Sequence, residues 1–571
     1  MLLEVKDLII SYGSALPAVE HVSIQVQAGE SLGLVGESGS GKSTLGRSLI
    51  QLLPSHAQVS GYISIDDMSV MDLSAGQLRH LRGEKVALIF QDPMTRLNPL
   101  MTIEAHGLEV LRSHCPGISR RQALQDLHQA LSAVRIDPKR ARQYPHEFSG
   151  GMRQRVMIAL SLLLNPALLI ADEPTTSLDV TVATEILQEL TNLRRSRNMG
   201  LLLITHDLGL VAQYCDRIAV MYDGAIVETG SAQQIFRHPQ HPYTQKLIGS
   251  AIHFKDMRVP SIDNGKRASH ADALIPLTGQ AGNGMGREAS PANPYEPPIS
   301  SKPLLKVSNL IKHYATGSNF LARCFDLSDG LVRAVDGVSF QIFPGDIFGV
   351  IGESGSGKST TGRAILQLVT PDRGSVEFDG VELTRLKGGK LRRIRPQIQM
   401  IFQDPRACLN PHMTVLQSIA DPLFIHKLVP NRATAKEKVL SILERVGLSS
   451  QLASRFPRDL SGGQLQRVAI ARALITRPRF LICDEPVSML DATIQSQILQ
   501  LMLELKQEFN LTYMFITHDL GVAQFFCNRV AVMRQGKIVE QGSTESVLGN
   551  PTHPYTKALL NSVPRLPNLE N

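Results

Sequence analysis

The stretch GESGSGKST occurs twice in this chain, at residues 36–44 and again at 352–360. Each copy follows an apolar run, SLGLVG or DIFGVIG, and ends in Gly-Lys-Ser-Thr. Glycines at these positions let backbone N–H groups curl around an anion, and a helix that starts at the lysine adds its positive end. The pattern Gly-x-x-x-x-Gly-Lys-Ser therefore predicts a phosphate-binding loop in each copy. A glycine-rich turn without a ligand is the alternative, and two identical copies that each follow a strand disfavour it.

We call these two segments the phosphate loops. In each, we expect the lysine to reach the β- and γ-phosphates of ATP and the first serine to hold Mg²⁺. The candidate ATP ligands are all residues of the two loops: Gly36, Glu37, Ser38, Gly39, Ser40, Gly41, Lys42, Ser43, Thr44, Gly352, Glu353, Ser354, Gly355, Ser356, Gly357, Lys358, Ser359 and Thr360. Ser43 and Ser359 are the candidate metal ligands among them.

The similarity between the two regions extends far beyond the loops. The matching pairs are QDPMTRLNPLMT (91–102) with QDPRACLNPHMT (403–414), FSGGMRQRV (148–156) with LSGGQLQRV (460–468), LLIADEP (168–174) with FLICDEP (480–486), and HPYTQKLI (241–248) with HPYTKALL (553–560). All of these pairs lie 312 positions apart, and the loops lie 316 apart. The sequence therefore predicts two paralogous domains in tandem.

We place the first domain at residues 1–252 and the second at 304–571. Residues 253–303 between them are rich in Pro, Gly, Ser and Asn and show no apolar period, which predicts a flexible linker. A flexible coil of that length spans roughly 40 Å root-mean-square. Such a linker lets the two domains meet head to tail as an intramolecular pseudo-dimer.

Composition narrows the class of protein. The 571-residue chain is 43% hydrophobic and 19% charged, with a formal net charge of +7, which is typical of a globular protein with a solvated surface. The six cysteines are widely spaced and form no Cys-x-x-Cys pair, so neither a zinc site nor a disulfide framework is predicted. The start of the chain, MLLEVKDLII, lacks the pattern of a signal peptide.

One apolar run, VMIALSLLLNPALLIA (156–171), needs an explanation other than a membrane span. Asn165-Pro166 interrupts it and Asp172-Glu173 end it, so we expect a buried helix, a turn and a buried strand. Other runs such as GLLLIT and RIAVMY resemble short buried strands, and they alternate with helical stretches. The fold predicted for each half is α/β with a mainly parallel sheet core.

Each of the strands LLIADE and FLICDE runs into two carboxylates. Buried acidic groups are costly unless a cation or a reacting water lies beside them. We expect Asp172 and Asp484 to hold Mg²⁺ through water, and Glu173 and Glu485 to act as general bases toward the attacking water. The alternative, a pair of solvated loop acids, is disfavoured by the neighbouring phosphate loops.

Together these motifs resemble the ATPase domain of ABC transporters over nearly all of each half, and the resemblance implies helical and antiparallel β subdomains beside the mainly parallel sheet core. That domain carries a phosphate loop, a lone Gln, a Ser-Gly-Gly signature, an Asp-Glu pair, a Ser-x-Leu-Asp turn and a lone His in this order. The corresponding residues are Gln91 and Gln403, Ser149-Gly150-Gly151-Met152 and Ser461-Gly462-Gly463-Gln464, Ser177-Leu178-Asp179 and Met489-Leu490-Asp491, and His206 and His518.

The resemblance implies roles for these residues. The Gln would sense Mg²⁺ and the membrane partner, the His would contact the γ-phosphate, and the signature would cap ATP held by the opposite domain. A helix that begins at Ser-Gly-Gly would present free N–H groups that lack a phosphate in their own domain. Two loops would then be needed because two ATP molecules are sandwiched between the halves.

Tyr12 and Tyr314 lie upstream of the loops and resemble the aromatic residue that stacks on adenine in such ATPases. A strand-end tyrosine without a ligand is the alternative. The second half has 38 positions from Tyr314 to Gly352, against 24 from Tyr12 to Gly36, so the correspondence is weaker there.

The C-terminal segments HPQHPYT (238–244) and NPTHPYT (550–556) resemble the extension of the peptide/nickel class of ABC importers. For His241 and His553 we favour a structural role in a Pro turn that caps a helix over any ligand role. Relatives in this class can carry a cysteine cluster after this motif. Because the sequence has no cysteine between 216 and 323 and none after 527, we predict no iron–sulfur cluster or zinc, and ATP and Mg²⁺ as the cofactors.

The leading functional hypothesis is the ATP-hydrolysing subunit of an importer, peripheral on the cytoplasmic face of the inner membrane. Its partners would be two transmembrane permease subunits and, indirectly, a solute-binding protein, with no nucleic acid. The alternative is a soluble tandem ATPase that acts on ribosomes or nucleic acid, and half of an exporter is disfavoured because no membrane helices are fused. The sequence leaves open which peptide-like solute or metal chelate is carried.

Overall fold

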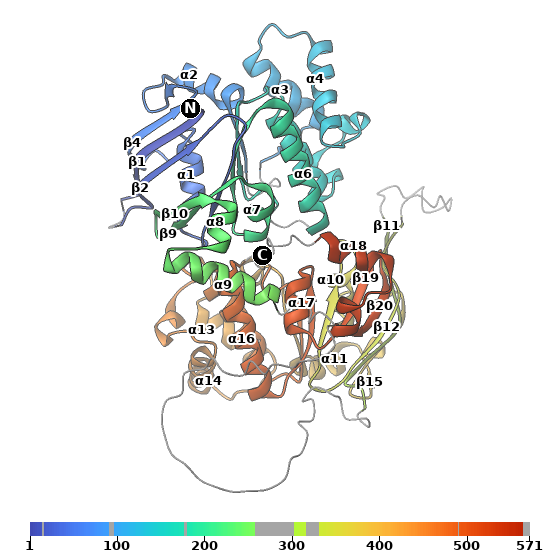
Figure 1. The fold of residues 1–571 in the computed structure, drawn as a ribbon. Helices are drawn as coiled ribbons and strands as arrows, with labels where there is room; N and C mark the ends of the chain where they lie inside the picture. The colour runs from blue at the N-terminus through green and yellow to red at the C-terminus, as the bar shows by residue number, and fades with distance from the viewer. Residues whose placement is uncertain are drawn as a thin grey trace, which may run out of the picture.

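The computed structural model shows two halves of the same architecture (Figure 1). The structure describes residues 1–13, 16–90, 96–175, 180–256, 302–315, 331–488 and 490–562. Gln91, the turn 177–179, Met489 and most of the predicted linker 253–303 therefore lie outside the described residues.

Each half begins with an antiparallel sheet. In the first half β1 (Leu3–Ser11) lies between β2 (Val19–Val26) and β4 (Gln58–Ile65), and β5 (Met68–Ser69) pairs with β4. Buried and exposed side chains alternate along most of β2, as expected for a strand with one face on the core. This sheet shares an apolar core with β3 and α1, the elements on either side of the phosphate loop.

The second sheet of the first half carries the predicted nucleotide motifs. Its strands, in spatial order, are β10 (Ala225–Ser231), β9 (Arg217–Tyr222), β3 (Ser31–Val35), β8 (Gly200–Ile204), β7 (Leu168–Asp172) and β6 (Val86–Ile89). Only β10 runs antiparallel to its neighbour in this sheet. Strands β3, β7 and β8 are fully buried apolar runs, which is typical of parallel strands covered on both faces.

Helices surround the sheets of the first half. They are α1 (Lys42–Ser48), α2 (Ala75–His80), α3 (Ile103–His114), α4 (Arg120–Ala133), α5 (Gly150–Ser161), α6 (Val180–Arg197), α7 (Leu208–Tyr214), α8 (Ala232–Arg237) and α9 (Pro242–Asp256). Helices α3, α4 and α5 pack together as a helical subdomain beside the central sheet (Figure 1).

The second half repeats this plan. Its antiparallel sheet contains β12 (Leu331–Ile342), β11 (Leu305–Ala315), β14 (Arg373–Phe378) and β15 (Val381–Glu382). Its central sheet contains β16 (Ile398–Ile401), β17 (Phe480–Asp484), β18 (Thr512–Thr517), β13 (Ile347–Ile351), β19 (Arg529–Arg534) and β20 (Lys537–Ser543). Its helices are α10 (Lys358–Ile365), α11 (Gly388–Ile394), α12 (Pro405–Cys408), α13 (Val415–Ile425), α14 (Arg432–Arg445), α15 (Gly462–Leu474), α16 (Ala492–Phe509), α17 (Leu520–Phe526) and α18 (Pro554–Ser562).

The two halves meet through their C-terminal helices. Helix α9 of the first half packs against α16 and α17 of the second half, and α18 of the second half packs against α6 of the first (Figure 1). The last described helix of each half therefore packs on the other half.

The structure confirms the predicted fold class, two α/β domains each with a mainly parallel core and an antiparallel subdomain. It also confirms the interpretation of residues 156–171, where α5 ends, a turn follows and β7 begins. Helix α9 continues to Asp256, past the predicted end of the first domain at residue 252. The first residues of the predicted linker therefore belong to α9.

Candidate functional site

Each phosphate loop connects a buried strand of the central sheet to a helix that begins at the lysine. In the first half the loop follows β3, and α1 begins at Lys42. Gly41, directly before this lysine, has a φ of 100°, which residues with a side chain rarely adopt. A Cβ there would lie 2.4 Å from the carbonyl oxygen of Ala18, so only glycine fits. Gly357 repeats this geometry in the second half, with a φ of 104° and a Cβ position 2.0 Å from the Ala334 carbonyl oxygen.

The loop lysines are buried and held by their own loops. Lys42 Nζ donates to the carbonyl oxygens of Gly36, at 2.8 Å, and Glu37, at 2.7 Å. Lys358 makes the same two contacts in its loop, at 2.7 and 2.8 Å. Burial lowers the pKa of Lys42, while the carboxylates of nearby acidic residues oppose this shift. The backbone carbonyl oxygens of each loop thus fix the position of its ammonium group.

The predicted metal ligands of each half lie together. Ser43 Oγ donates to Asp172 Oδ1 at 2.8 Å, and Ser359 Oγ donates to Asp484 Oδ1 at 2.7 Å. Both aspartates are fully buried, and burial raises the pKa of each against the effect of the serine hydrogen bond. Within the described residues Asp484 Oδ2 has no hydrogen-bond donor. A buried carboxylate oxygen without a donor beside a serine hydroxyl fits an Mg²⁺ site.

The predicted general bases follow these aspartates in both halves. Glu173 and Glu485 have φ values of 49° and 47°, a left-handed backbone that costs energy and often occurs at functional sites. Glu173 Oε1 lies 3.2 Å from Nδ1 of His206, and Glu485 Oε2 lies 3.2 Å from Nδ1 of His518. In the second half Gln403 Nε2 also donates to Glu485 Oε2 at 2.8 Å. The structure thus brings the predicted Glu and His together in both halves, and the Gln with them in the second.

The Glu–His contacts favour a charged pair. Burial lowers the pKa of His518, but the negative charge of Glu485, whose Oε2 lies 3.2 Å from Nδ1, outweighs it and raises the pKa overall. His206 shows the same balance with Glu173. Burial also raises the pKa of Glu485, yet His518, Lys358 and Gln403 together bring it below its ordinary value. In each half the glutamate therefore favours the protonated form of the neighbouring imidazole.

The signature residues begin a helix in each half, as predicted. Ser149 is the N-cap of α5 and Ser461 is the N-cap of α15, with the signature glycines in the first turn. Ser461 Oγ accepts from the backbone N–H of Gln464 at 3.3 Å, and Gln464 Oε1 accepts from the Ser461 N–H at 3.1 Å. In the first half Met152 replaces this glutamine, and its Sδ lies 3.2 Å from Nη1 of Arg140.

Each phosphate loop also faces the opposite half. Thr181 Oγ1 in α6 donates to Glu353 Oε1 in the second phosphate loop at 2.9 Å. The negative charge of Asp491, the N-cap of α16, acts on Lys42 in the first loop. Thr181 follows the turn 177–179, and Asp491 ends the turn 489–491. These contacts match a head-to-tail pairing, whereas the placement of a signature over the opposite ATP stays a prediction.

The predicted adenine-stacking residues differ in their surroundings. The ring of Tyr12 lies 5.9 Å from the ring of His56 and packs against the apolar core of the antiparallel sheet. Tyr314, at the end of β11, is 41% exposed, and Lys312 Nζ lies 5.5 Å from its ring centre. Stacking on adenine stays a prediction for both residues.

The HPYT segments have the structural role that we favoured for their histidines. The ring Nδ1 of His241 accepts from the backbone N–H of Tyr243 at 3.2 Å, at the start of α9. His553 caps α18 in the same way through Tyr555, at 3.1 Å. Sequence reasoning missed the two tyrosines, which contact the phosphate loops. Their occurrence 312 positions apart in both halves was the signal that could have found them.

Clusters of metal-binding side chains and long apolar helices bear on cofactors and the membrane. In the described ranges of the chain, no group of three or more His, Cys, Asp or Glu side chains is arranged to hold a metal ion. Among the helices that the structure describes, none is both long and apolar enough to cross a membrane.

Comparison with known proteins places these sites in a family. The profile described as ABC transporter matches residues 19–176 and 335–488, and the one described as oligopeptide/dipeptide transporter, C-terminal region, matches residues 227–272 and 539–571. The glutathione import ATP-binding protein GsiA of Shigella boydii serotype 4 is 44% identical over 567 residues. GsiA of Escherichia coli strain K12 is 44% identical over 563 residues, and in both cases 96% of this chain and 87% of the relative are covered.

A dimeric structure of the ATP-binding cassette MJ0796 with ADP and Pi aligns at 31% identity and a TM-score of 0.38, over 42% of this chain and 98% of that one. The ABC transporter profile covers more than half of this chain, and the GsiA relatives match almost all of it. The protein therefore belongs to the ABC transporter family, as a chain with two fused ATP-hydrolysing ABC domains that each carry the oligopeptide/dipeptide transporter C-terminal region.

Proposed function

We propose that this chain hydrolyses ATP at two sites, each completed by the opposite half, to power the import of glutathione or similar short peptides. The observation that carries this proposal is the pairing of two ABC transporter profile matches with two oligopeptide/dipeptide C-terminal regions in one chain. The 44% identical relatives are named as glutathione import proteins, which favours a peptide-like cargo.

The side chains of each half suit the chemistry of phosphoryl transfer to water. In the second half Glu485 takes a proton from the attacking water, and Gln403 and His518 hold its carboxylate in place. The imidazole contacts the γ-phosphate, and Lys358 stabilises the charge on the β- and γ-phosphates. Glu173, His206 and Lys42 do the same in the first half.

Mg²⁺ fits the serine–aspartate pairs of both halves. Ser43 with Asp172, and Ser359 with Asp484, would hold the ion, with Gln91 and Gln403 as the further ligands expected from the resemblance. When bound, Mg²⁺ neutralises the negative charge that develops on the phosphates.

The second half also offers a docking surface for a membrane subunit. A hollow of about 180 Å³ beside the segment after Gln403 is lined by Phe402, Pro405 and Ile425, among others. Ile425 is 45% exposed, and the neighbouring Phe424 is 43% exposed. Apolar side chains exposed beside Gln403, the residue expected to sense the membrane partner, suit the docking of such a partner.

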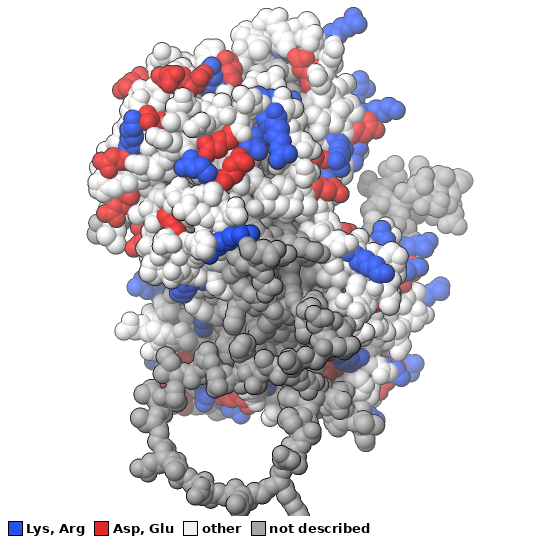
Figure 2. Space-filling view, in the orientation of Figure 1, with Lys and Arg blue, Asp and Glu red and all other residues white. Residues whose placement is uncertain are grey.

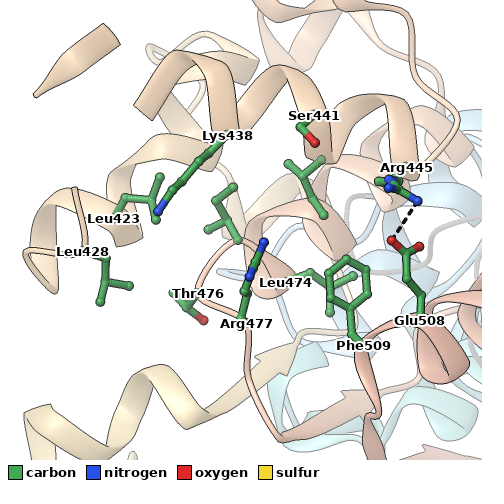
Figure 3. A pocket seen from close by; sticks show the side chains of 12 residues that line it. Leu423, Leu428, Lys438, Ser441, Arg445, Leu474, Thr476, Arg477, Glu508 and Phe509 are labelled. Carbon is green, nitrogen blue, oxygen red and sulfur yellow. Dashed lines mark ion pairs between the residues drawn. The ribbon is translucent and has the colours of Figure 1, made fainter. Parts of the chain in front are cut away.

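A second hollow, of about 300 Å³, lies between α14, α15 and the end of α16 (Figure 3). Leu423 and Leu428 line one side of it, and Arg445 pairs with Glu508 on the other, at 2.8 Å.

On the face seen in Figure 2, basic and acidic side chains are interspersed. This charge distribution gives little reason to expect a nucleic-acid surface there, and the comparisons give the ribosome-associated alternative no support.

Purification from native membranes and transport measurement test this function. A tagged chain should bring down two hydrophobic subunits, and this complex in liposomes should take up radiolabelled glutathione or dipeptides in an ATP-dependent manner. The Lys42→Ala/Lys358→Ala variant, which should assemble but not bind ATP, is the control. Co-sedimentation of the chain with ribosomes, without any membrane partner, would contradict the proposal.

A further inference from the structure

The C-terminal regions contact the phosphate loops in a way that the ATP chemistry above does not use. The hydroxyl of Tyr243 accepts a hydrogen bond from the backbone N–H of Glu37 at 3.0 Å. The hydroxyl of Tyr555 accepts one from the N–H of Glu353 at 3.3 Å. Glu37 and Glu353 are the second residues of the two loops. The same contact therefore occurs in both halves, at the entry of each loop.

Both tyrosines are held firmly by their surroundings. Tyr243 is 8% exposed, and its ring centre lies 4.2 Å from that of Tyr222 at the end of β9. The start of α9 is fixed by His241, whose own N–H donates to Glu228 Oε2 at 3.0 Å. A buried, packed ring on a fixed helix start places its hydroxyl with little loss of entropy on forming the bond.

The second half holds Tyr555 in a similar way, but with a different neighbour beside the ring. Tyr555 is 7% exposed, and the guanidinium of Arg534 lies 4.7 Å from its ring centre where the first half has Tyr222. Glu540 accepts from the N–H groups of Thr552 and His553, at 2.8 and 3.3 Å. Different neighbours thus support the same hydroxyl-to-loop contact, which indicates that this contact is the shared feature.

The helices that carry these tyrosines are also the helices that contact the opposite half. Helix α9 packs on α16 and α17, and α18 packs on α6, where Thr184 Oγ1 donates to the Ser562 carbonyl oxygen at 3.2 Å. Glu353 is contacted by both halves. Its N–H is bound by Tyr555 of its own half, and its carboxylate accepts from Thr181 of the other half, at 2.9 Å.

A charged residue of the opposite half also acts on the first loop. The carboxylate of Asp491 in the second half acts on both Lys42 and Tyr243. Burial, helped by the charges of Glu37 and Asp491, raises the pKa of Tyr243 to about 12. Its hydroxyl therefore keeps its proton at neutral pH, and it serves as a neutral acceptor for the loop amide.

We propose that Tyr243 and Tyr555 are positioning residues that fix the entry of the phosphate loop in their own half and link its geometry to the contact between the halves. Because each tyrosine lies on a helix that packs on the opposite half, a shift of one half relative to the other moves the hydroxyl that holds the loop. A change in the packing between the halves then alters ATP binding through the C-terminal region.

The test isolates one ATP site at a time in the full chain. In the Lys358→Ala background only the first loop binds ATP, and a fluorescent ATP analogue is titrated. Tyr243→Phe, which removes only the hydroxyl, should weaken this site by about two- to ten-fold, the equivalent of one hydrogen bond. Tyr555→Phe should leave the same site unchanged, and in the Lys42→Ala background the two effects should exchange.

Matched controls separate positioning from stability. Tyr222→Phe removes a hydroxyl from the ring that packs against Tyr243, and it should leave ATP affinity unchanged. Thermal melting without nucleotide shows whether each variant is folded. Unchanged ATP affinity for Tyr243→Phe at the first site would overturn the proposal, and so would an equal loss from Tyr555→Phe at that site.

A double-mutant cycle tests the link between the halves. In the Lys42→Ala background, Thr181→Val and Tyr555→Phe should each weaken the second site, since both remove a contact to Glu353. The double variant should lose clearly less than the product of the two single losses, because the two contacts hold one residue. Independent, multiplicative losses would show that Tyr555 does not connect the loop to the opposite half.

Discussion

At the scale of single residues, the site depends on a glutamate that leaves its strand in a left-handed turn. This turn follows a buried aspartate in both halves, so the proposed metal ligand and the proposed base are adjacent in sequence, while the aspartate contacts a serine and the glutamate contacts a histidine. His206 and His518 then orient the two glutamates. The adjacency of Asp and Glu was readable from the sequence, whereas the turn that separates their roles was not.

Replacing Glu173 and Glu485 together by Gln should leave ATP binding intact and lower hydrolysis by about 10²–10⁴-fold, the usual effect of a positioned general base. Glutamine keeps the shape of the side chain but cannot accept the proton of the attacking water. Phosphate release and ATP binding are measured on the same preparation. Near-normal turnover would remove the glutamates from the mechanism.

The Glu485–His518 pair also predicts a pH dependence of stability. The folded state raises the pKa of His518 above 6.5, so the pair's contribution is fully present below pH 6.5 and is lost as the pH rises through the folded value. His518→Gln should therefore lower the unfolding midpoint more at pH 6 than at pH 9. An equal difference at both pH values would show that the imidazole is not held as a cation.

At the scale of elements, the start of the signature helix differs between the halves. Helix α15 has a complete capping box between Ser461 and Gln464, whereas in α5 Ser149 makes no side-chain cap bond and Met152 lies at the third position. In a head-to-tail pair, ATP on Lys358 faces the uncapped α5. Loss of a capping interaction costs about 0.5–2 kcal/mol.

The Lys358 site should therefore bind ATP several-fold more weakly than the Lys42 site, because a less ordered helix start must be fixed on binding. Separate Lys42→Ala and Lys358→Ala variants, titrated with ATP, compare the two sites. Met152→Gln should restore the capping box and bring the Lys358 site close to the other. Equal affinities before this substitution would show that the Met/Gln difference has no energetic consequence.

Some elements and contacts could be predicted from local sequence patterns, and others could not. Motifs at the ends of buried parallel strands, and helices that begin at Ser-Gly-Gly, follow from local patterns, and the structure confirmed them. The end of α9 and the contacts of Tyr243 and Tyr555 did not follow. They depend on packing between segments about 200 positions apart, and on contacts between the halves, which leave no local period.

At the scale of the whole molecule, fusion makes the pairing of the two halves intramolecular. The contacts of α9 and α18 with the opposite half place the linker between two domains that already meet. We expect residues 257–301, which join the halves in sequence, to raise the effective concentration of each half for the other.

Cutting the chain within residues 257–301 should then yield two halves that still bind each other in the presence of ATP. Their association should depend on concentration, because the tether no longer holds them together. Analytical ultracentrifugation of the cut and intact proteins measures this. Complete loss of association even at high concentration would mean that the linker is a structural element of the pair.

If a single chain closes around two ATP molecules, as we propose, each closed chain should hold two of them. The Glu173→Gln/Glu485→Gln variant, incubated with radiolabelled ATP and Mg²⁺, should retain two ATP per chain in a particle with the mass of one chain. Lys42→Ala or Lys358→Ala in this variant should each abolish the stable closed state, because it needs ATP at both sites. Retention of ATP only in particles of two chains, or full retention with one lysine removed, would contradict the intramolecular pairing of the two halves.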